Sequence, residues 1–292
     1  MTTEIYYFSG TGNSLFIARE LQKRLPDAAL IPIISLLDQE TIETAGRAVG
    51  LVFPVHALTN PIAVRRFLRK ADFSSADYVF AVATRLGTVY RGFEEIGRLL
   101  KKKGSRLDAH LVLNMGNNEP RHGKYTVPTP EDLKTLEDAA LKRLDSFAGK
   151  VMQKAICHEK GAEEGITFGM HPLLNSFMEK LTISGLSLSE HFGGVNYFYA
   201  DEKCVGCGIC QKVCLSGKIQ MQGGKPVWAR KPLCYMCFAC LNYCPKHAMQ
   251  IKDIVFVKSQ SRTNGRYPHP YATAQEIARQ KEIAGEPASP SV

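Results

Sequence analysis

The cysteines carry the clearest chemistry in this sequence. Eight of the nine lie in two runs that share the spacing C-x2-C-x2-C-x3-C. The first run is Cys204, Cys207, Cys210 and Cys214, and the second is Cys234, Cys237, Cys240 and Cys244. Three thiolates separated by two-residue gaps can hold three corners of a cuboidal [4Fe–4S] cluster, and the fourth thiolate comes from elsewhere in the chain. The spacing therefore predicts two such clusters.

In the bacterial two-cluster pattern, the fourth ligand of each cluster belongs to the other run. We therefore expect Cys244 to complete the cluster of the first run and Cys214 to complete that of the second. Structural zinc sites usually combine separate cysteine pairs or a pair with histidines, which fits this spacing poorly. Disulfides usually accompany a secretory signal, and the N-terminus lacks the basic and apolar regions of one.

This part of the sequence resembles bacterial two-[4Fe–4S] ferredoxins. Pro245 follows the last cysteine as in that family, whereas Leu215 stands where a second proline could follow Cys214. All eight ligand positions are retained, so the difference concerns only the local turn.

The two cysteine loops differ in the residues between their ligands. The first contains Gly206 and Gly208, and the second contains Met236 and Phe238. Glycines let backbone N–H groups approach the cluster sulfurs, whereas bulky side chains exclude water, and both effects tune potential. We therefore expect the two clusters to differ in reduction potential.

A second chemical signal lies near the N-terminus. A short apolar strand at residues 4–8 leads into Ser9-Gly10-Thr11-Gly12-Asn13-Ser14, and an amphipathic helix follows at residues 15–25. The backbone N–H groups of a helix start, the helix macrodipole and nearby hydroxyl groups together favour a phosphate. The candidate phosphate-binding residues are Ser9, Thr11, Gly12, Asn13 and Ser14.

The sequence argues against two common phosphate ligands, a nucleoside triphosphate and a dinucleotide. No Walker A motif is present, and Leu15 occupies the third glycine position of a dinucleotide-binding G-x-G-x-x-G. The second strand has no acidic residue near its end for a ribose hydroxyl, since Asp38 is the first. The loop instead resembles that of flavodoxins, which implies that it binds the phosphate of FMN. The alternative is an ordinary turn in which Ser14 or Asn13 only caps the helix.

Further apolar strands alternate with helical patterns. Strands are expected at residues 29–32, 48–53, 78–83 and 109–113, and helices at 61–70, 93–103 and 130–154. This alternation predicts an α/β fold with a doubly wound parallel sheet. Five strands suit the flavodoxin-like order 2-1-3-4-5, with the ligand at the carboxyl ends of the strands.

The loops at those carboxyl ends are candidates for binding the flavin ring, as the flavodoxin resemblance implies. They supply Pro54, Val55, His56 and Ala57 after the third strand, Thr84, Arg85, Leu86 and Gly87 after the fourth, and Asn118 after the fifth. His56 could contact the ring or move protons, and an exposed loop histidine is the alternative. Arg85 could stabilise a reduced flavin or simply lie in solvent.

These patterns divide the whole sequence into four segments. We expect a flavodoxin-like domain at residues 1–154, a connector at 155–194, a small α+β two-[4Fe–4S] domain at 195–257 and a partly disordered tail at 258–292. Gly223-Gly224 predicts a hairpin within the small domain. Cys157 lies outside both runs, and we interpret it as a structural or incidental thiol.

The net charge of +9 would fit nucleic-acid binding, but two clusters and a flavin phosphate would remove most of it. We therefore expect no nucleic-acid partner. No run of about 18 apolar residues predicts a membrane span. Together with the missing signal peptide, this favours a cytoplasmic protein with reduced thiols.

The order of the two motifs resembles flavodoxin–ferredoxin fusion proteins, as do Phe53-Pro54-Val55-His56 and Arg266-Tyr267. The resemblance implies FMN and two [4Fe–4S] clusters in one oxidoreductase or electron carrier. Flavin accepts one or two electrons and a cluster accepts one, so their combination suits electron transfer between a low-potential donor and an acceptor. Three functions stay open: electron transfer to or from a redox protein, reduction of a small molecule at the flavin, and a flavin-free redox sensor or subunit.

Overall fold

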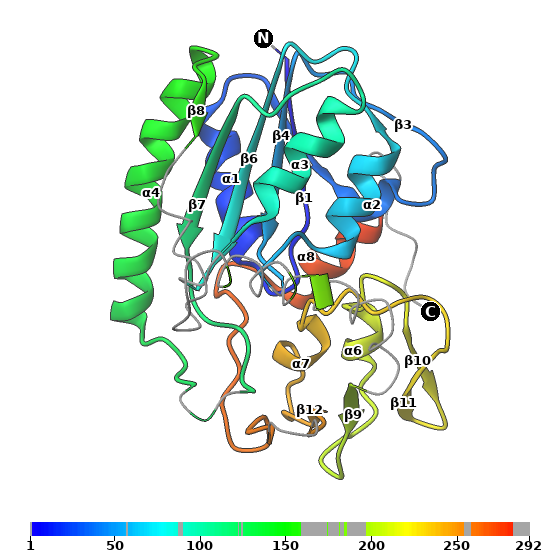
Figure 1. Ribbon diagram of the computed structural model, residues 1–292. Helices are drawn as coiled ribbons and strands as arrows, with labels where there is room; N and C mark the ends of the chain where they lie inside the picture. Colours follow the sequence, from blue (N-terminus) through cyan, green and yellow to red (C-terminus); the bar gives the residue numbers. More distant parts are fainter. Residues whose placement is uncertain are drawn as a thin grey trace.

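The computed structural model describes residues 2–56, 58–86, 90–121, 123, 125–158, 174, 181, 184–185, 197–253 and 258–282. The described residues form a larger α/β domain and a smaller domain beneath it (Figure 1). The carboxyl ends of the parallel strands point toward the smaller domain. The predicted ligand-binding edge of the sheet therefore faces the cysteine-rich region.

A parallel sheet forms the centre of the larger domain. Its strands, in the order in which they pair, are β2 (Ala28–Pro32), β1 (Thr3–Tyr7), β4 (Ala48–Pro54), β6 (Tyr78–Arg85), β7 (Ala109–Asn114) and β8 (Cys157–His158). The first five have the flavodoxin order 2-1-3-4-5, so the predicted fold class is confirmed. The sixth, β8, was not expected, and it places Cys157 beside Ala109 at the sheet edge.

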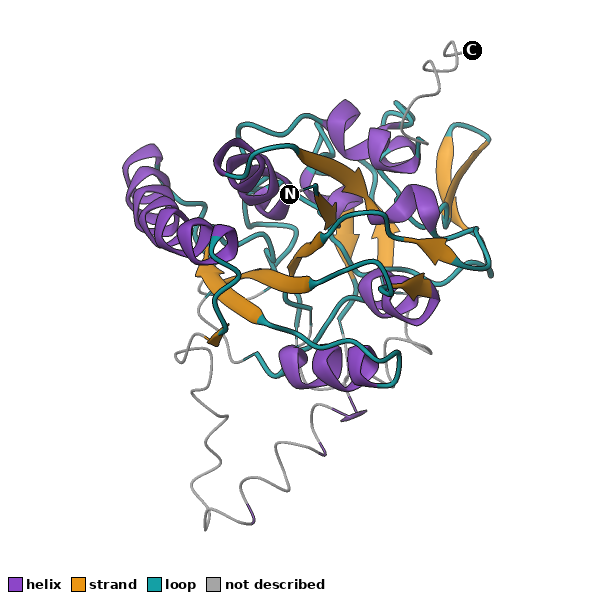
Figure 2. Cartoon of the chain, turned by 90° about the horizontal axis from the view of Figure 1, so that it is seen from above, coloured by secondary structure: helices purple, strands orange, loops and turns teal. Residues whose placement is uncertain are grey.

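Helices cover both faces of this sheet (Figure 2). One face carries α1 (Asn13–Arg24) and α4 (Pro130–Met152), and the other carries α2 (Ile62–Lys70) and α3 (Gly92–Lys101). The central strands β4 and β6 are buried along almost their whole length, which explains their uninterrupted apolar sequences. At the periphery lie η1 (Ile33–Leu36) and the short parallel pair β3 (Ile42–Glu43) and β5 (Ala71–Asp72). Among the helices of the described residues, none has the length and apolar character needed to cross a bilayer.

The smaller domain consists of short elements around the cysteines. Two four-residue helices, α6 (Ile209–Lys212) and α7 (Ala239–Asn242), follow the two cysteine loops. Strand β9 (Phe198–Ala200) pairs with β12 (Met249–Ile251). The predicted hairpin is present as β10 (Ile219–Gln222) and β11 (Lys225–Trp228), joined through Gly223 and Gly224.

The chain then returns to the larger domain. Within the predicted tail, residues 266–281 form a segment that we call the C-terminal strap, which contains α8 (Ala274–Ala278) and η2 (Arg279–Lys281). The buried guanidinium of Arg266 anchors its start by donating to the carbonyl oxygens of Leu241 and Met249. Arg19 of α1 pairs with Glu276 of α8 at 2.7 Å. The strap is therefore packed against both domains, and residues 283–292 of the predicted tail lie outside the described part.

Candidate cluster and flavin sites

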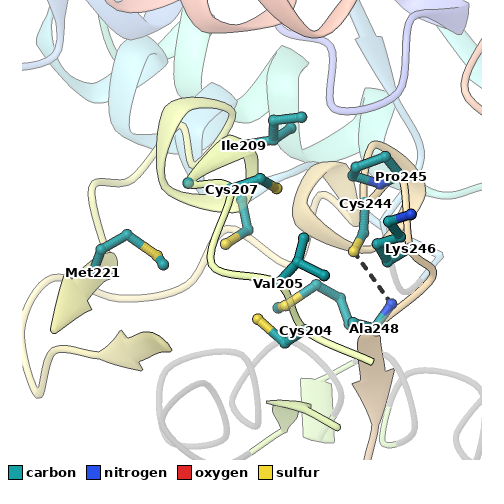
Figure 3. A pocket seen from close by; sticks show the side chains of 12 residues that line it. Cys204, Val205, Cys207, Ile209, Met221, Cys244, Pro245, Lys246 and Ala248 are labelled. Atoms are coloured by element: carbon teal, nitrogen blue, oxygen red, sulfur yellow. Dashed lines mark hydrogen bonds between the residues drawn. The ribbon is translucent and has the colours of Figure 1, made fainter. Parts of the chain in front are cut away.

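The first cavity in the smaller domain gathers cysteines from both runs. It is lined by Cys204, Cys207, Cys210 and Cys244, a set that we call the first quartet. Figure 3 shows the labelled side chains of Cys204, Cys207 and Cys244 around one space. The backbone N–H of Ala248 donates to Sγ of Cys244 at 3.2 Å (Figure 3).

A second cavity gathers the other four. It is lined by Cys214, Cys234, Cys237 and Cys240, the second quartet, together with aromatic side chains that include Phe198, Trp228, Tyr235 and Phe238. The backbone N–H of Met236 donates to Sγ of Cys234 at 3.4 Å. Each cavity thus takes three cysteines from one run and one from the other, which is the expected interleaving.

The two cysteine loops have nearly the same backbone shape. Gly206 and Gly208 have φ values of 73° and 74°, and the matching Met236 and Phe238 have 51° and 57°. A residue with a side chain is disfavoured at positive φ, so the second loop holds a conformation that costs energy. Among the described residues, no three His, Cys, Asp or Glu side chains converge closely enough for a single metal ion. Each quartet instead lines a cavity of its own.

The quartets differ in their access to solvent. Cys207 of the first quartet is exposed, whereas Cys240 of the second is buried. Burial raises the pKa of the Cys234 thiol to about 11, against smaller opposing effects of the Met236 backbone hydrogen bond and the Lys218 charge, and raises that of Cys237 to about 12. These thiols are protonated at neutral pH unless a metal replaces the protons.

The second quartet lies directly against the predicted phosphate loop. A Cβ atom at Gly10 would lie 2.1 Å from the carbonyl oxygen of Cys237, so only glycine permits this approach. Phe8, which directly follows β1, packs edge-on against Tyr235 with ring centroids 6.1 Å apart. The Tyr235 hydroxyl lies 2.9 Å from a guanidinium nitrogen of Arg66 in α2. The loop between Cys234 and Cys237 therefore forms part of the junction between the domains.

His56 also lies at this junction. Its ring packs edge-on to Phe8 at 5.9 Å and lies near the backbone of Tyr235. Burial, assisted by the charge of Arg65, lowers the pKa of His56 to about 4. His56 is therefore a neutral imidazole at physiological pH, in contact with the second cysteine loop rather than freely exposed.

The phosphate loop itself is buried and well connected. Gly12 has a φ of 106°, and its backbone N–H donates to Oγ of Ser9 at 3.2 Å. The amide of Asn118 donates to Oγ1 of Thr11 at 2.6 Å, and the Asn13 amide donates to the carbonyl of Gly116 at 2.8 Å. These contacts join the loop after β1 to the loop after β7.

The C-terminal strap covers the outer side of the same loop. The backbone N–H of His269 donates to the carbonyl of Thr11 at 2.7 Å. Gln280, whose side chain is fully buried, accepts from the N–H of Ser9 at 3.0 Å and donates to the Ser9 carbonyl at 2.8 Å. These strap contacts were not predicted from the sequence, where Arg266-Tyr267 and a possible short helix after Pro270 were the signals in this region.

The donors of the loop fit a phosphate. The hydroxyl groups of Ser9 and Thr11 each accept a hydrogen bond from the protein, which leaves their own hydrogens available to an anion. The loop opens the twelve-residue helix α1, whose N-terminus favours negative charge. No carboxylate occurs between Ser9 and Ser14. The loop is thus suited to a buried phosphate. Cys237 and the strap pack against the loop.

The candidate ring-binding residues are only partly gathered. Ser14 and Thr84 share a hydrogen bond of 2.8 Å between their hydroxyl oxygens, and the N–H of Val55 donates to the Thr84 carbonyl. Pro54 ends β4 beside them. Arg85 instead donates to the Asn114 side chain at 3.1 Å, and Leu86 is 51% exposed. Ala57 and Gly87 lie outside the described residues.

Comparison with known proteins bears on the cysteine-rich region. Residues 203–249 match the 4Fe-4S dicluster domain family. The region is 33% identical over 66 residues to an uncharacterized ferredoxin of Methanocaldococcus jannaschii, covering 22% of this chain and 86% of that protein. The chain belongs to the [4Fe–4S] dicluster ferredoxin family. A ferredoxin of Methanothermococcus thermolithotrophicus is also 33% identical, over 54 residues that cover 18% of this chain and 90% of that protein.

The membership concerns the C-terminal region of this ferredoxin-family chain. The larger domain is similar to a flavodoxin variant from Pseudomonas aeruginosa, with 18% identity over 52% of this chain and 99% of that one, at a TM-score of 0.35. Its flavodoxin-like character rests on the parallel strand order described above. The chain thus joins a flavodoxin-like domain to a dicluster ferredoxin domain.

Proposed function

We propose that this protein is an iron–sulfur flavoprotein that transfers electrons between two [4Fe–4S] clusters and FMN. The first quartet would hold one cluster and the second quartet the other. The phosphate of FMN would lie on the loop from Ser9 to Ser14. The second quartet's contact with this loop, through Cys237 and Gly10, is the observation that carries the proposal.

The order of the sites along the molecule supports this function. The first quartet reaches solvent through Cys207, and the adjoining Val205 is 63% exposed. The second quartet adjoins the flavodoxin-like domain, where Tyr235 packs on Phe8 and the Cys237 carbonyl lies against Gly10. A redox protein would therefore contact the first quartet. Electrons would then pass from the first quartet to the second and on to the flavin at the buried phosphate loop.

The chain's own residues would bind and enclose the flavin rather than react. FMN accepts one or two electrons, so it would link the single-electron capacity of a cluster to two-electron chemistry. The N-terminus of α1 and the hydroxyl groups of Ser9 and Thr11 would bind its phosphate without a cationic side chain. The neutral imidazole of His56 would provide a polar group at the junction. Cluster formation needs reduced thiols, and we therefore propose a cytoplasmic location.

Anaerobic purification with quantified cofactors tests this function. We expect about eight iron atoms and about eight sulfides for each chain, as two [4Fe–4S] clusters require, together with one FMN. We also expect that a reductant able to reduce the clusters bleaches the flavin absorbance.

Iron and sulfide without flavin would contradict the flavoprotein assignment. That result would favour a flavin-free redox sensor or subunit. One observation favours this alternative, because the Ser9, Thr11 and Ser14 side chains all form hydrogen bonds within the protein. A preparation with both cofactors but no electron transfer between them would instead contradict the role of the junction.

A further inference from the structure

A buried lysine adjoins the second quartet. Lys218 is 1% exposed, and its Nζ donates to the carbonyl oxygens of Ala229 at 3.0 Å and Pro232 at 2.8 Å. A third carbonyl, that of Arg230, lies 3.5 Å away. Three carbonyl dipoles can orient an ammonium group, but they carry no compensating charge. Among the described residues, no carboxylate forms an ion pair with Lys218.

Such a lysine needs an anion nearby, since charged groups are almost never fully buried unless they are paired. Lys218 lines the same cavity as the four cysteines of the second quartet. Gly217, with a φ of 67°, turns the chain after Cys214 so that Lys218 enters this cavity wall before β10 begins. A cluster with four thiolate ligands carries net negative charge, so it would supply the missing anion.

The lysines near the first quartet are exposed, unlike Lys218. Lys246 lines its cavity, and Lys225 donates to the carbonyl of Cys204 at 2.8 Å, yet both lysines are exposed. Water screens exposed charges strongly, whereas a buried charge acts through a less polarisable medium. The buried cation near the first quartet is Arg266, whose charge acts on Cys244, but its guanidinium donates to the carbonyl oxygens of Leu241 and Met249. In the described part of the chain, the cavity of the first quartet is thus not lined by a buried cation, whereas that of the second is lined by Lys218.

We propose that Lys218 raises the reduction potential of the cluster in the second quartet relative to the cluster in the first. Reduction adds one electron, supplied by an external reductant, and makes the cluster more negative. The fixed ammonium of Lys218 stabilises that added charge. The inference rests on the cluster assignment proposed above, and it gives the electron a favoured position beside the flavodoxin-like domain.

Potentiometric titration of the intact, anaerobically purified protein tests the proposal, with the reduced clusters followed by electron paramagnetic resonance. In Lys218→Gln, we expect the reduction equilibrium constant of one cluster to fall at least tenfold, which is about 59 mV for one electron. The other cluster should shift less. Lys218→Arg keeps the charge and should restore the potential, and Lys246→Gln is the matched control at the first quartet.

Unchanged potentials in Lys218→Gln, with both clusters present, would overturn the proposal. If that variant loses iron, Lys218→Met offers a neutral side chain of similar length for the same titration. Loss of the cluster from both neutral variants, with retention in Lys218→Arg, would also overturn it and leave Lys218 as a structural anchor for residues 229–232. A wild-type protein without iron would instead contradict the proposed function itself.

Discussion

Replacement of Cys244 by alanine should remove the same cluster as replacement of Cys207, although the two cysteines belong to different runs. Both line the cavity of the first quartet, whereas Cys237 and Cys240 line the other cavity. A cluster that loses one of its four thiolates loses a ligand at one corner of its cage. We expect each variant to retain about half of the iron of the wild-type protein.

The spectra of four variants decide which cysteines act together. Cys207→Ala and Cys244→Ala should retain one and the same cluster signal, and Cys214→Ala and Cys237→Ala should both retain the other. Cys157→Ala is the control, because this cysteine lies in β8 of the larger domain and should leave iron content unchanged. If Cys244→Ala resembled Cys237→Ala instead, each run would hold its own cluster and the interleaved assignment would be wrong.

The sequence was sufficient for the fold class because strong local patterns determine it. Strands β4 and β6 are continuous apolar runs between helical segments, and such an alternation has few stable arrangements other than a parallel sheet. The hairpin was equally local, since Gly223 and Gly224 adopt the positive φ values that its turn requires. The gathering of the two quartets also follows from spacing within two short segments.

Contacts between distant segments could not be predicted in the same way. Ser9 and Gln280 are separated by 271 positions, and nothing in the composition of either segment indicates that they meet. The two residues of β8 are too few to show an alternating pattern. Lys218 is a polar residue in a polar stretch, so its burial depends on how residues 229–232 fold back over it. These features arise from packing rather than from local propensity.

The strap links the phosphate loop to the ferredoxin-like domain. Asn242, next to the second quartet, accepts from the N–H of Tyr267 at 3.0 Å, and Tyr243 donates to the carbonyl of Ala272 at 2.9 Å. The same strap then contacts Thr11 and Ser9 of the loop. Assembly of the cysteine-rich domain and enclosure of the phosphate loop are therefore connected through residues 266–281.

Replacement of Gln280 by alanine should weaken FMN binding at least tenfold. The side-chain amide of Gln280 satisfies both the N–H and the carbonyl of Ser9, and all of these groups are buried. A buried polar group that loses its partner costs about 1–3 kcal/mol, and each 1.4 kcal/mol corresponds to about a tenfold change in affinity. The loop can recover these bonds only by moving from its phosphate-binding shape, so we expect the loss to appear as weaker flavin retention. Equilibrium dialysis or fluorescence titration with FMN would measure it.

Gln275→Ala is the matched control, because Gln275 is exposed on α8 in the same strap. It should leave both the FMN affinity and the thermal midpoint unchanged, and iron content should stay at the wild-type level in both variants. A Gln280→Ala protein with a lower thermal midpoint but an unaltered FMN affinity would show that the strap only stabilises the fold. A tenfold loss of FMN affinity with intact clusters would instead mean that the strap holds Ser9 in position for the phosphate. Gln280 bonds to Ser9 and lines neither cysteine cavity, so its loss should not act through the clusters.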